Sequence, residues 1–246
     1  AQTPKRRAKT GELSKGSSVT VGLEQDLDSL DPHKAVAAGT REVLFNIFEG
    51  RMKASPDGGV IPAVASDYTV SDDGLQYTFT LREGVKFHNG NAVTMEDVLY
   101  SLERCAGSEN DGTPLISAFS NVTSMEATDD THVVLTLKEP NLEFINSMTA
   151  AIIPANSSDT IATTPVGTGP FAFTSYTPQQ RMEMKKFDGS WGEPAQLDQV
   201  TFRILTDVNP LVMGLQGGTP DLVLPLPTSV PKGFGQHFLV TQNPIN

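Results

Sequence analysis

The chain has 246 residues, of which 38% are hydrophobic and 19% charged, and its only cysteine is Cys105. This size and composition are typical of a globular protein with a sizeable core, and a single cysteine excludes both an intramolecular disulfide framework and a multi-cysteine metal site. The formal charge of -11 disfavours nucleic acid as a partner, because phosphate binding depends on clustered lysine and arginine. The chain contains no run of 18 apolar residues, so we expect no membrane-spanning helix.

The amino-terminal segment, residues 1–17, is polar and has no hydrophobic periodicity. Its positive cluster, Lys5, Arg6 and Arg7, carries too few charges to hold the chain on an anionic membrane. We therefore expect a flexible leader ahead of the first strand. The segment lacks the apolar stretch of a signal peptide, so any such peptide is expected to have been removed or never to have been included.

The first structured segment combines a strand with a helix. Alternating apolar and polar residues predict a strand over 18–23. After an Asp-Pro turn, Thr40 is placed to cap a helix over 41–48, and Gly50 is placed to end it. The buried face of that helix is expected to comprise Val43, Leu44, Ile47 and Phe48.

Short strands and hairpins characterise residues 51–165. Strict alternation predicts a strand over 76–81, and a strand pair is predicted over 122–127 and 132–137. Thr94 and Asp97 have the spacing of a capping box at the start of a helix. The apolar face of this helix is expected to comprise Met95, Val98, Leu99 and Leu102. A short helix is expected over 141–148.

A third segment starts at the turn formed by residues 167–170. The alternating pattern then predicts strands and one helix. The strands are expected over 171–175, 182–187, 200–204 and 221–224, and the helix over 209–215.

The sequence carries no recognisable catalytic or cofactor motif. It has neither the GxSxG nor the HExxH pattern, and the Gly-Thr-Gly-Pro turn at 167–170 lacks the Gly-Lys-Ser/Thr ending of a phosphate loop. The four histidines are far apart in sequence: His33, His88, His132 and His237. We therefore predict a protein that is not an enzyme and that binds no metal or organic cofactor.

Five separated motifs resemble one family, the peptide- and nickel-type (family 5) solute-binding proteins of ABC importers. They occur in the family's order over about 19–226. They are Ser29–His33 (SLDPH), Tyr77–Arg104 (YTFTLREGVKFHNGNAVTMEDVLYSLER), Val166–Phe171 (VGTGPF), Phe187–Pro194 (FDGSWGEP, with Ser190 in place of the family's tyrosine) and residues 201–224.

The resemblance implies an α/β fold, the first lobe of a two-lobed, periplasmic-binding-protein-like clamshell. Its mixed central sheet would carry a hairpin-rich inserted subdomain, and a second lobe follows in family members. In these terms, 18–50 and 166–232 would form a discontinuous lobe core, 51–165 the inserted subdomain, and 233–246 the start of the crossover.

The resemblance also implies a function. The chain would be a monomer that captures peptides or a similar small solute outside the membrane and delivers it to a permease. Attachment through a removed, lipid-bearing amino-terminal segment is left open. Two alternatives remain: an isolated lobe that acts as a protein-interaction module without solute binding, and an enzyme built on this scaffold. Calorimetry against peptide and metal-chelate libraries would separate the binding protein from the interaction module, and turnover of a trapped ligand would support the enzyme.

In this family the loop after the SLDPH-like motif faces the ligand cleft. The resemblance therefore implies ligand-binding residues in two segments, and the helix start at Thr40 and Arg41 could present amides to an anionic group. These residues are Val36, Ala37, Ala38, Gly39, Thr40, Arg41, Thr149 and Ala150. The second segment has no basic residue, which counts against a nickel chelate, and Trp191 is assigned to packing. Because a lone lobe covers only part of a ligand, we expect millimolar or weaker affinity.

Overall fold

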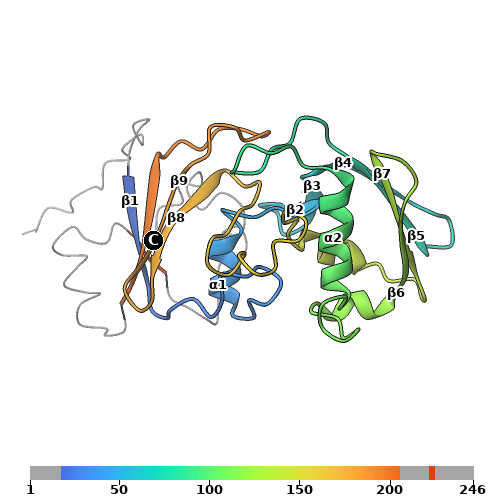
Figure 1. Cartoon of the computed structure of the whole chain (residues 1–246), viewed down its shortest axis with the longest axis horizontal. Helices are drawn as coiled ribbons and strands as arrows, with labels where there is room; N and C mark the ends of the chain where they lie inside the picture. The colour runs from blue at the N-terminus through green and yellow to red at the C-terminus, as the bar shows by residue number, and fades with distance from the viewer. Residues whose placement is uncertain (1–17, 206–221, 225–246) are drawn as a thin grey trace, which may run out of the picture.

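The computed structural model describes residues 18–205 and 222–224, which form two regions side by side (Figure 1). One region is a mixed sheet with α1 beside it, and the other is an antiparallel sheet with α2. The predicted leader (1–17), the predicted helix (209–215) and the predicted crossover (233–246) lie outside the described residues. No helix of the described residues is long and apolar enough to cross a membrane.

The mixed sheet brings together strands from both ends of the described chain. In the strand order β11-β1-β10-β9-β8, β1 runs parallel to β10 and β11, whereas β9 is antiparallel to β10 and β8. Buried apolar residues such as Val21 and Phe202, which are register partners, form its core. The strands are β1 (Ser18–Leu23), β8 (Phe171–Thr177), β9 (Arg181–Lys186), β10 (Gln199–Ile204) and β11 (Leu222–Leu224), which agrees with the strands predicted there.

Helix α1 spans Ala38–Leu44, so the prediction of a helix over 41–48 capped by Thr40 was wrong. Thr40 lies inside the helix, where its hydroxyl accepts a hydrogen bond from the amide of Asp28 at 3.1 Å. After Leu44 the amides of Asn46 and Ile47 bond to carbonyls three residues earlier, which ends the α-helical pattern. The predicted buried face is confirmed, since all of its members are buried: Val43, Leu44, Ile47 and Phe48.

Gly50 does not end this helix, which is a second correction. Its φ is not positive, and a Cβ there would lie 2.6 Å from the carbonyl oxygen of Ala150. The requirement for glycine at this position is therefore close approach of two backbones rather than a left-handed conformation.

The antiparallel sheet of the second region has the strand order β4-β5-β7-β6. Its inner face is formed by alternate residues such as Tyr77, Phe79 and Leu135, all buried. The predicted strands over 76–81, 122–127 and 132–137 are confirmed. The strands are β4 (Ala65–Val70), β5 (Gln76–Leu81), β6 (Val122–Ala127) and β7 (His132–Leu137).

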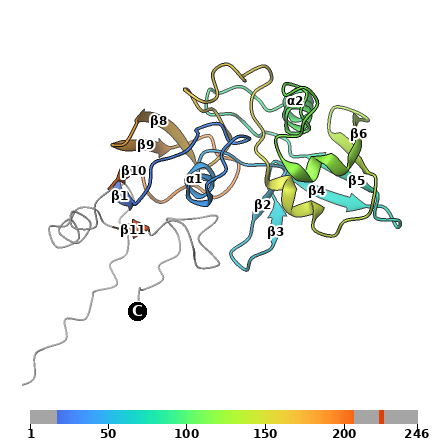
Figure 2. The same ribbon diagram turned by 90° about the horizontal axis from the view of Figure 1, so that it is seen from below.

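A separate hairpin, β2 (Met52–Ala54) with β3 (Val60–Pro62), lies between α1 and the antiparallel sheet (Figure 2). The two remaining short elements are 3-10 helices: η1 (Ser117–Asn121) and η2 (Phe144–Thr149). The short helix predicted over 141–148 therefore begins three residues later, at Phe144, and is a 3-10 helix.

Helix α2 (Met95–Cys105) begins with the predicted capping box, since the amide of Thr94 donates to Asp97 Oδ2 at 2.8 Å. Its predicted apolar face is buried except for the half-buried Leu99. A second face is buried as well, and it includes Ser101 and Arg104. The helix thus contacts more than the sheet beside it, and its polar residues are directed to the junction between the regions.

Arg104 joins the two regions through a buried ion pair. Its guanidinium donates to both carboxylate oxygens of Asp31, at 3.0 and 2.6 Å, and to Nδ1 of His33 at 2.8 Å. The other ring nitrogen of His33 donates to the carbonyl of Ala151 at 2.8 Å. One network therefore fixes the SLDPH loop, α2 and the segment after η2 relative to one another.

Candidate functional site

The loop hollow, a cavity of about 590 Å³, lies between the segment before α1 and the end of η2. It is lined by Pro32, His33, Lys34, Ala35, Val36, Arg41, Leu44, Phe45, Phe48, Leu115, Ile116, Ser117, Asn146, Ser147, Thr149, Ala150 and Ala151.

Four of the eight predicted ligand-binding residues line this hollow: Val36, Arg41, Thr149 and Ala150. The other four do not. Ala37 is half-buried and Ala38 is exposed outside the lining, whereas Gly39 and Thr40 are buried within α1. The structure thus brings together two segments that are distant in sequence.

Asp28 shapes the first wall. Its Oδ2 accepts hydrogen bonds from the amides of Val36 and Ala37 at 2.8 and 3.2 Å, and the side chain of Val36 remains 75% exposed. Burial opposes ionisation of Asp28, but the bonds from Thr40 and from these amides outweigh it and lower its pKa. The exposed carboxylate of Asp28 therefore fixes the backbone of this loop.

The amide of Arg41 is not free to meet an anionic group, contrary to the expectation for this residue. The Arg41 amide donates within α1, to the carbonyl of Ala37 at 3.1 Å, because the helix begins three residues earlier than predicted. The guanidinium Nε of Arg41 donates to the carbonyl of Ala35 at 3.0 Å. The polar group that Arg41 offers to the hollow is thus its side chain.

His33 connects the two walls, since it lines the hollow and donates to Ala151 on the opposite side. Burial and the charge of Arg104 lower the pKa of His33 to about 4, against the opposing effect of the hydrogen bond to Ala151. Burial also opposes ionisation of Asp31, but the hydrogen bonds and charge of Arg104 keep its pKa below the usual value. At neutral pH the network therefore holds a neutral imidazole beside an ion pair.

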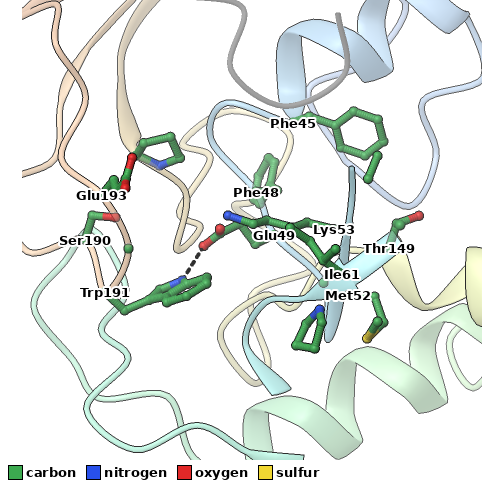
Figure 3. Close-up of a pocket in the computed structure, with 15 residues that line it drawn as sticks. Phe45, Phe48, Glu49, Met52, Lys53, Ile61, Thr149, Ser190, Trp191 and Glu193 are labelled. Atoms are coloured by element: carbon green, nitrogen blue, oxygen red, sulfur yellow. Dashed lines mark hydrogen bonds between the residues drawn. The ribbon is translucent and has the colours of Figure 1, made fainter. Parts of the chain in front are cut away.

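The tryptophan hollow adjoins the first, since both are lined by Phe45, Phe48 and Thr149 (Figure 3). Its volume is about 390 Å³. The remaining lining residues are Glu49, Gly50, Met52, Lys53, Ala54, Ile61, Pro62, Pro170, Ser190, Trp191, Gly192 and Glu193.

Trp191 is held in this hollow by three groups. Its indole nitrogen donates to Glu49 Oε1 at 2.8 Å (Figure 3). The centroid of its ring lies 4.1 Å from the guanidinium carbon of Arg82 and 4.9 Å from the ammonium nitrogen of Lys53. The half-buried side chain also packs against the core of the second region. The packing assigned from sequence is thus present, and the same ring also forms a wall of the hollow.

Glu49 is a buried carboxylate, and its Oε1 also accepts a hydrogen bond from the hydroxyl of Thr168 at 3.0 Å. Burial raises its pKa, although the hydrogen bond from Trp191 and the charge of Lys53 act in the opposite direction. Sequence reasoning did not select Glu49 or Lys53. Both lie in a stretch without periodic pattern, and the opposite wall of the hollow comes from distant residues, namely Thr149, Pro170 and residues 190–193.

Among residues 18–205 and 222–224, no group of three or more histidine, cysteine, aspartate or glutamate side chains is arranged to hold a metal ion.

Comparison with known proteins adds a family. A model described as bacterial extracellular solute-binding proteins, family 5 middle, matches residues 59–240. Over 218 residues the chain is 34% identical to the glutathione-binding protein GsiB of Salmonella paratyphi A and 33% identical to that of Escherichia coli. Either alignment covers 85% of this chain but 42% of the relative, so the chain spans less than half of their length.

Solved structures show the same fold. The periplasmic binding protein DppA of Helicobacter pylori, in complex with the peptide STSA, is 26% identical with a TM-score of 0.77, over 83% of this chain and 46% of that one. The binding protein AgaA of Agrobacterium tumefaciens, in complex with agropinic acid, is 31% identical with a TM-score of 0.77, over 84% of this chain and 43% of that one. These similarities confirm the predicted fold class, a mixed α/β part of a periplasmic-binding-protein architecture.

Proposed function

The chain belongs to family 5 of the bacterial extracellular solute-binding proteins, and we propose from this that it captures a small solute, peptide-like in size, in the loop hollow. Relatives support this solute class, since they are named for glutathione or are solved with a peptide or agropinic acid. The proposal includes delivery to the permease of an ABC importer, a location outside the cytoplasmic membrane, and a monomeric state.

One observation carries the proposal. Val36 precedes α1 and Arg41 lies within it. Thr149 is the last residue of η2 and Ala150 follows it, yet all four residues line one hollow. A concave surface with apolar walls and a few polar groups is the usual form of a small-molecule site. The His33–Ala151 bond fixes the spacing of its walls, so the surface is formed before a solute arrives.

The domain division is part of the proposal. Segments 18–50 and 166–232 form the lobe core and 51–165 forms an inserted subdomain, with the loop hollow where these parts meet. The sheet topology supports it, because β1 pairs with β10 and β11 while β4–β7 pair only with one another.

A titration with trialanine tests the proposed function. We expect saturable binding at millimolar concentration, and Ala150→Trp, which fills the loop hollow, should weaken it about tenfold or more. Leu142→Ala is the matched control, because Leu142 is 92% exposed and outside both hollows. Binding that is equal in both variants would contradict the assignment of the site. Submicromolar binding by this chain alone would show that it carries a complete site rather than one wall of a cleft.

A further inference from the structure

Two residues of opposite charge that line the tryptophan hollow, Glu49 and Lys53, have hydrogen-bonding atoms without a partner among the described residues. Glu49 accepts both of its hydrogen bonds on Oε1, and no described residue donates to Oε2. Oε2 is not among the buried side-chain atoms that lack a partner, so this oxygen is not sealed from solvent and can accept a hydrogen bond from a ligand in the hollow that Glu49 lines.

Lys53 supplies the second charge. Its side chain is half-buried and lies over Trp191, and among the described residues its ammonium has neither an ion pair nor a hydrogen bond. Arg82 differs, since its Nε donates to the carbonyl of Ala63 at 2.8 Å and it does not line the hollow. Lys53 is therefore the cation of this cluster that is available to a ligand.

The two charged groups are close but not paired. Burial raises the pKa of Glu49 and the charge of the nearby Lys53 ammonium opposes that shift, yet no ion pair joins the two groups. Figure 3 shows both side chains on the same side of the hollow as Trp191. A ligand that carried one charge only would satisfy one of these groups and be repelled by the other.

Apolar side chains form most of the remaining walls, and the third charged side chain of the lining, Glu193, is exposed. Phe45, Phe48, Met52 and Ile61 line the hollow, and Ile61 is 39% exposed there. They would cover an aliphatic or aromatic substituent next to a charged head. Ser190 also lines the hollow, at the position where the family resemblance has a tyrosine, so a small side chain leaves this space open.

We propose that the tryptophan hollow is a second subsite of the solute-binding surface and takes a zwitterionic head, an ammonium and a carboxylate on one carbon as in a free α-amino-acid group. The ammonium donates to Glu49 Oε2, the carboxylate pairs with Lys53, and the substituent packs against the apolar walls. The inference rests on the proposed function, because the two hollows share Phe45, Phe48 and Thr149 and one extended solute can occupy both.

The intrinsic fluorescence of the chain reports directly on this subsite, because Trp191 is its only tryptophan. L-Leucine is the probe, with L-leucinamide and N-acetyl-L-leucine as analogues that lack the anion or the cation. We expect a saturable change of emission with L-leucine at millimolar concentration and at least about tenfold weaker responses to both analogues, since each loses one charged hydrogen bond. No saturable response, or equal responses to all three compounds, would overturn the proposal.

Single substitutions in the tryptophan hollow test each proposed contact with the zwitterionic head. Lys53→Met and Glu49→Gln should each weaken L-leucine about tenfold or more, and Lys53→Met should abolish the preference over L-leucinamide. Glutamine retains an acceptor for Trp191 and Thr168, so an unchanged emission spectrum without ligand verifies that the hollow is intact. Ser190→Tyr should block the hollow without changing its charge, and Lys138→Met, an exposed lysine outside both hollows, is the control.

The test also distinguishes the subsite from the loop hollow. Ala150→Phe, which fills the loop hollow without adding a second tryptophan, should leave the L-leucine response unchanged, because Ala150 lines only the loop hollow. Trialanine binding with no L-leucine response would refute the subsite and leave the proposed function standing. An L-leucine response without trialanine binding would refute the loop hollow instead. A response of wild-type size in Lys53→Met would contradict the zwitterionic head.

Discussion

The two regions of the molecule differ in how far apart in sequence their strands pair. In the antiparallel sheet, β4 pairs with β5 and β6 with β7, neighbours along the chain. In the mixed sheet, β1 pairs with β10 and β11, from the other end of the described residues. Pairing in the antiparallel sheet is therefore mostly local, with β5–β7 as its longer-range pair, whereas the mixed sheet depends on contacts that hold the two ends of the described residues together. Arg104, Asp31 and His33 form a buried contact between the two regions.

The largest effect should come from breaking this contact. Arg104→Met leaves the buried carboxylate of Asp31 without its partner, and we expect the free energy of unfolding to fall by about 3–5 kcal/mol. Urea denaturation measures it. Glu109→Gln is the control, because Glu109 pairs with the same guanidinium but its side chain is 37% exposed, and it should cost at most about 1 kcal/mol. Equal losses in the two variants would show that the buried pair does not join the regions.

Acid should loosen the same contact. The pKa of His33 is lowered from 6.5 to about 4, so the unfolded chain binds the proton more readily. Stability is therefore highest above pH 6.5 and declines as the pH falls from 6.5 to 4, by on the order of 3 kcal/mol for this residue. Burial lowers the pKa of His88 to about 4 as well, so it adds to the decline in the same window.

Unfolding experiments over this pH range check the contribution of His33. His33→Gln should reduce the pH dependence between 6.5 and 4, whereas His132→Gln, at the start of β7 with a side chain that is 40% exposed, should retain it. If the pH dependence of the His33 variant matched that of the unsubstituted chain, the buried neutral imidazole would be ruled out.

Close backbone approach should have the next largest effect. A Cβ at Gly169 would lie 2.5 Å from the carbonyl oxygen of Asn46, where β8 begins beside the end of α1. Gly169→Ala should therefore cost about 1–3 kcal/mol. At Gly192 no atom lies within 4 Å of an added Cβ, and Gly192→Ala should change stability by less than about 0.5 kcal/mol. Thermal denaturation of both variants is the test, and a tolerated Gly169→Ala would contradict the close packing.

The smallest effect on stability is expected at the proposed binding surface itself. Val36 is 75% exposed and Val21 is fully buried in the mixed sheet, so the same substitution to alanine compares them directly. Val21→Ala should cost about 2 kcal/mol and Val36→Ala less than about 0.5 kcal/mol. A large loss in Val36→Ala would mean that the loop is part of the core rather than of a binding surface.

The contrast between local and distant contacts also explains how much of the fold could be predicted from sequence. The alternation in β5 and the capping box of α2 act over a few residues, and both were predicted correctly. The start of α1 was missed because Thr40 bonds to Asp28, a contact no local pattern indicates. The hairpin β2–β3 was also missed, since each strand has only three residues.

The binding surface was predicted less well, for a related reason. Family resemblance indicated the loop hollow, but the positions within it depend on where α1 begins, so Gly39 and Thr40 proved to be buried. The tryptophan hollow could not be predicted, because Glu49, Lys53 and Trp191 meet only after the two regions have packed together. Arg104 has the appearance of an ordinary surface arginine in a helix, and only tertiary structure reveals its partners.

Amide chemical-shift mapping with trialanine tests the central claim most directly, namely that this chain forms the solute-binding surface of a family 5 protein. We predict that saturable shifts at millimolar peptide cluster in residues 33–41 and 146–151, the two walls of the loop hollow. Shifts that cluster instead on β4–β7, or no saturable shift at all, would contradict the account.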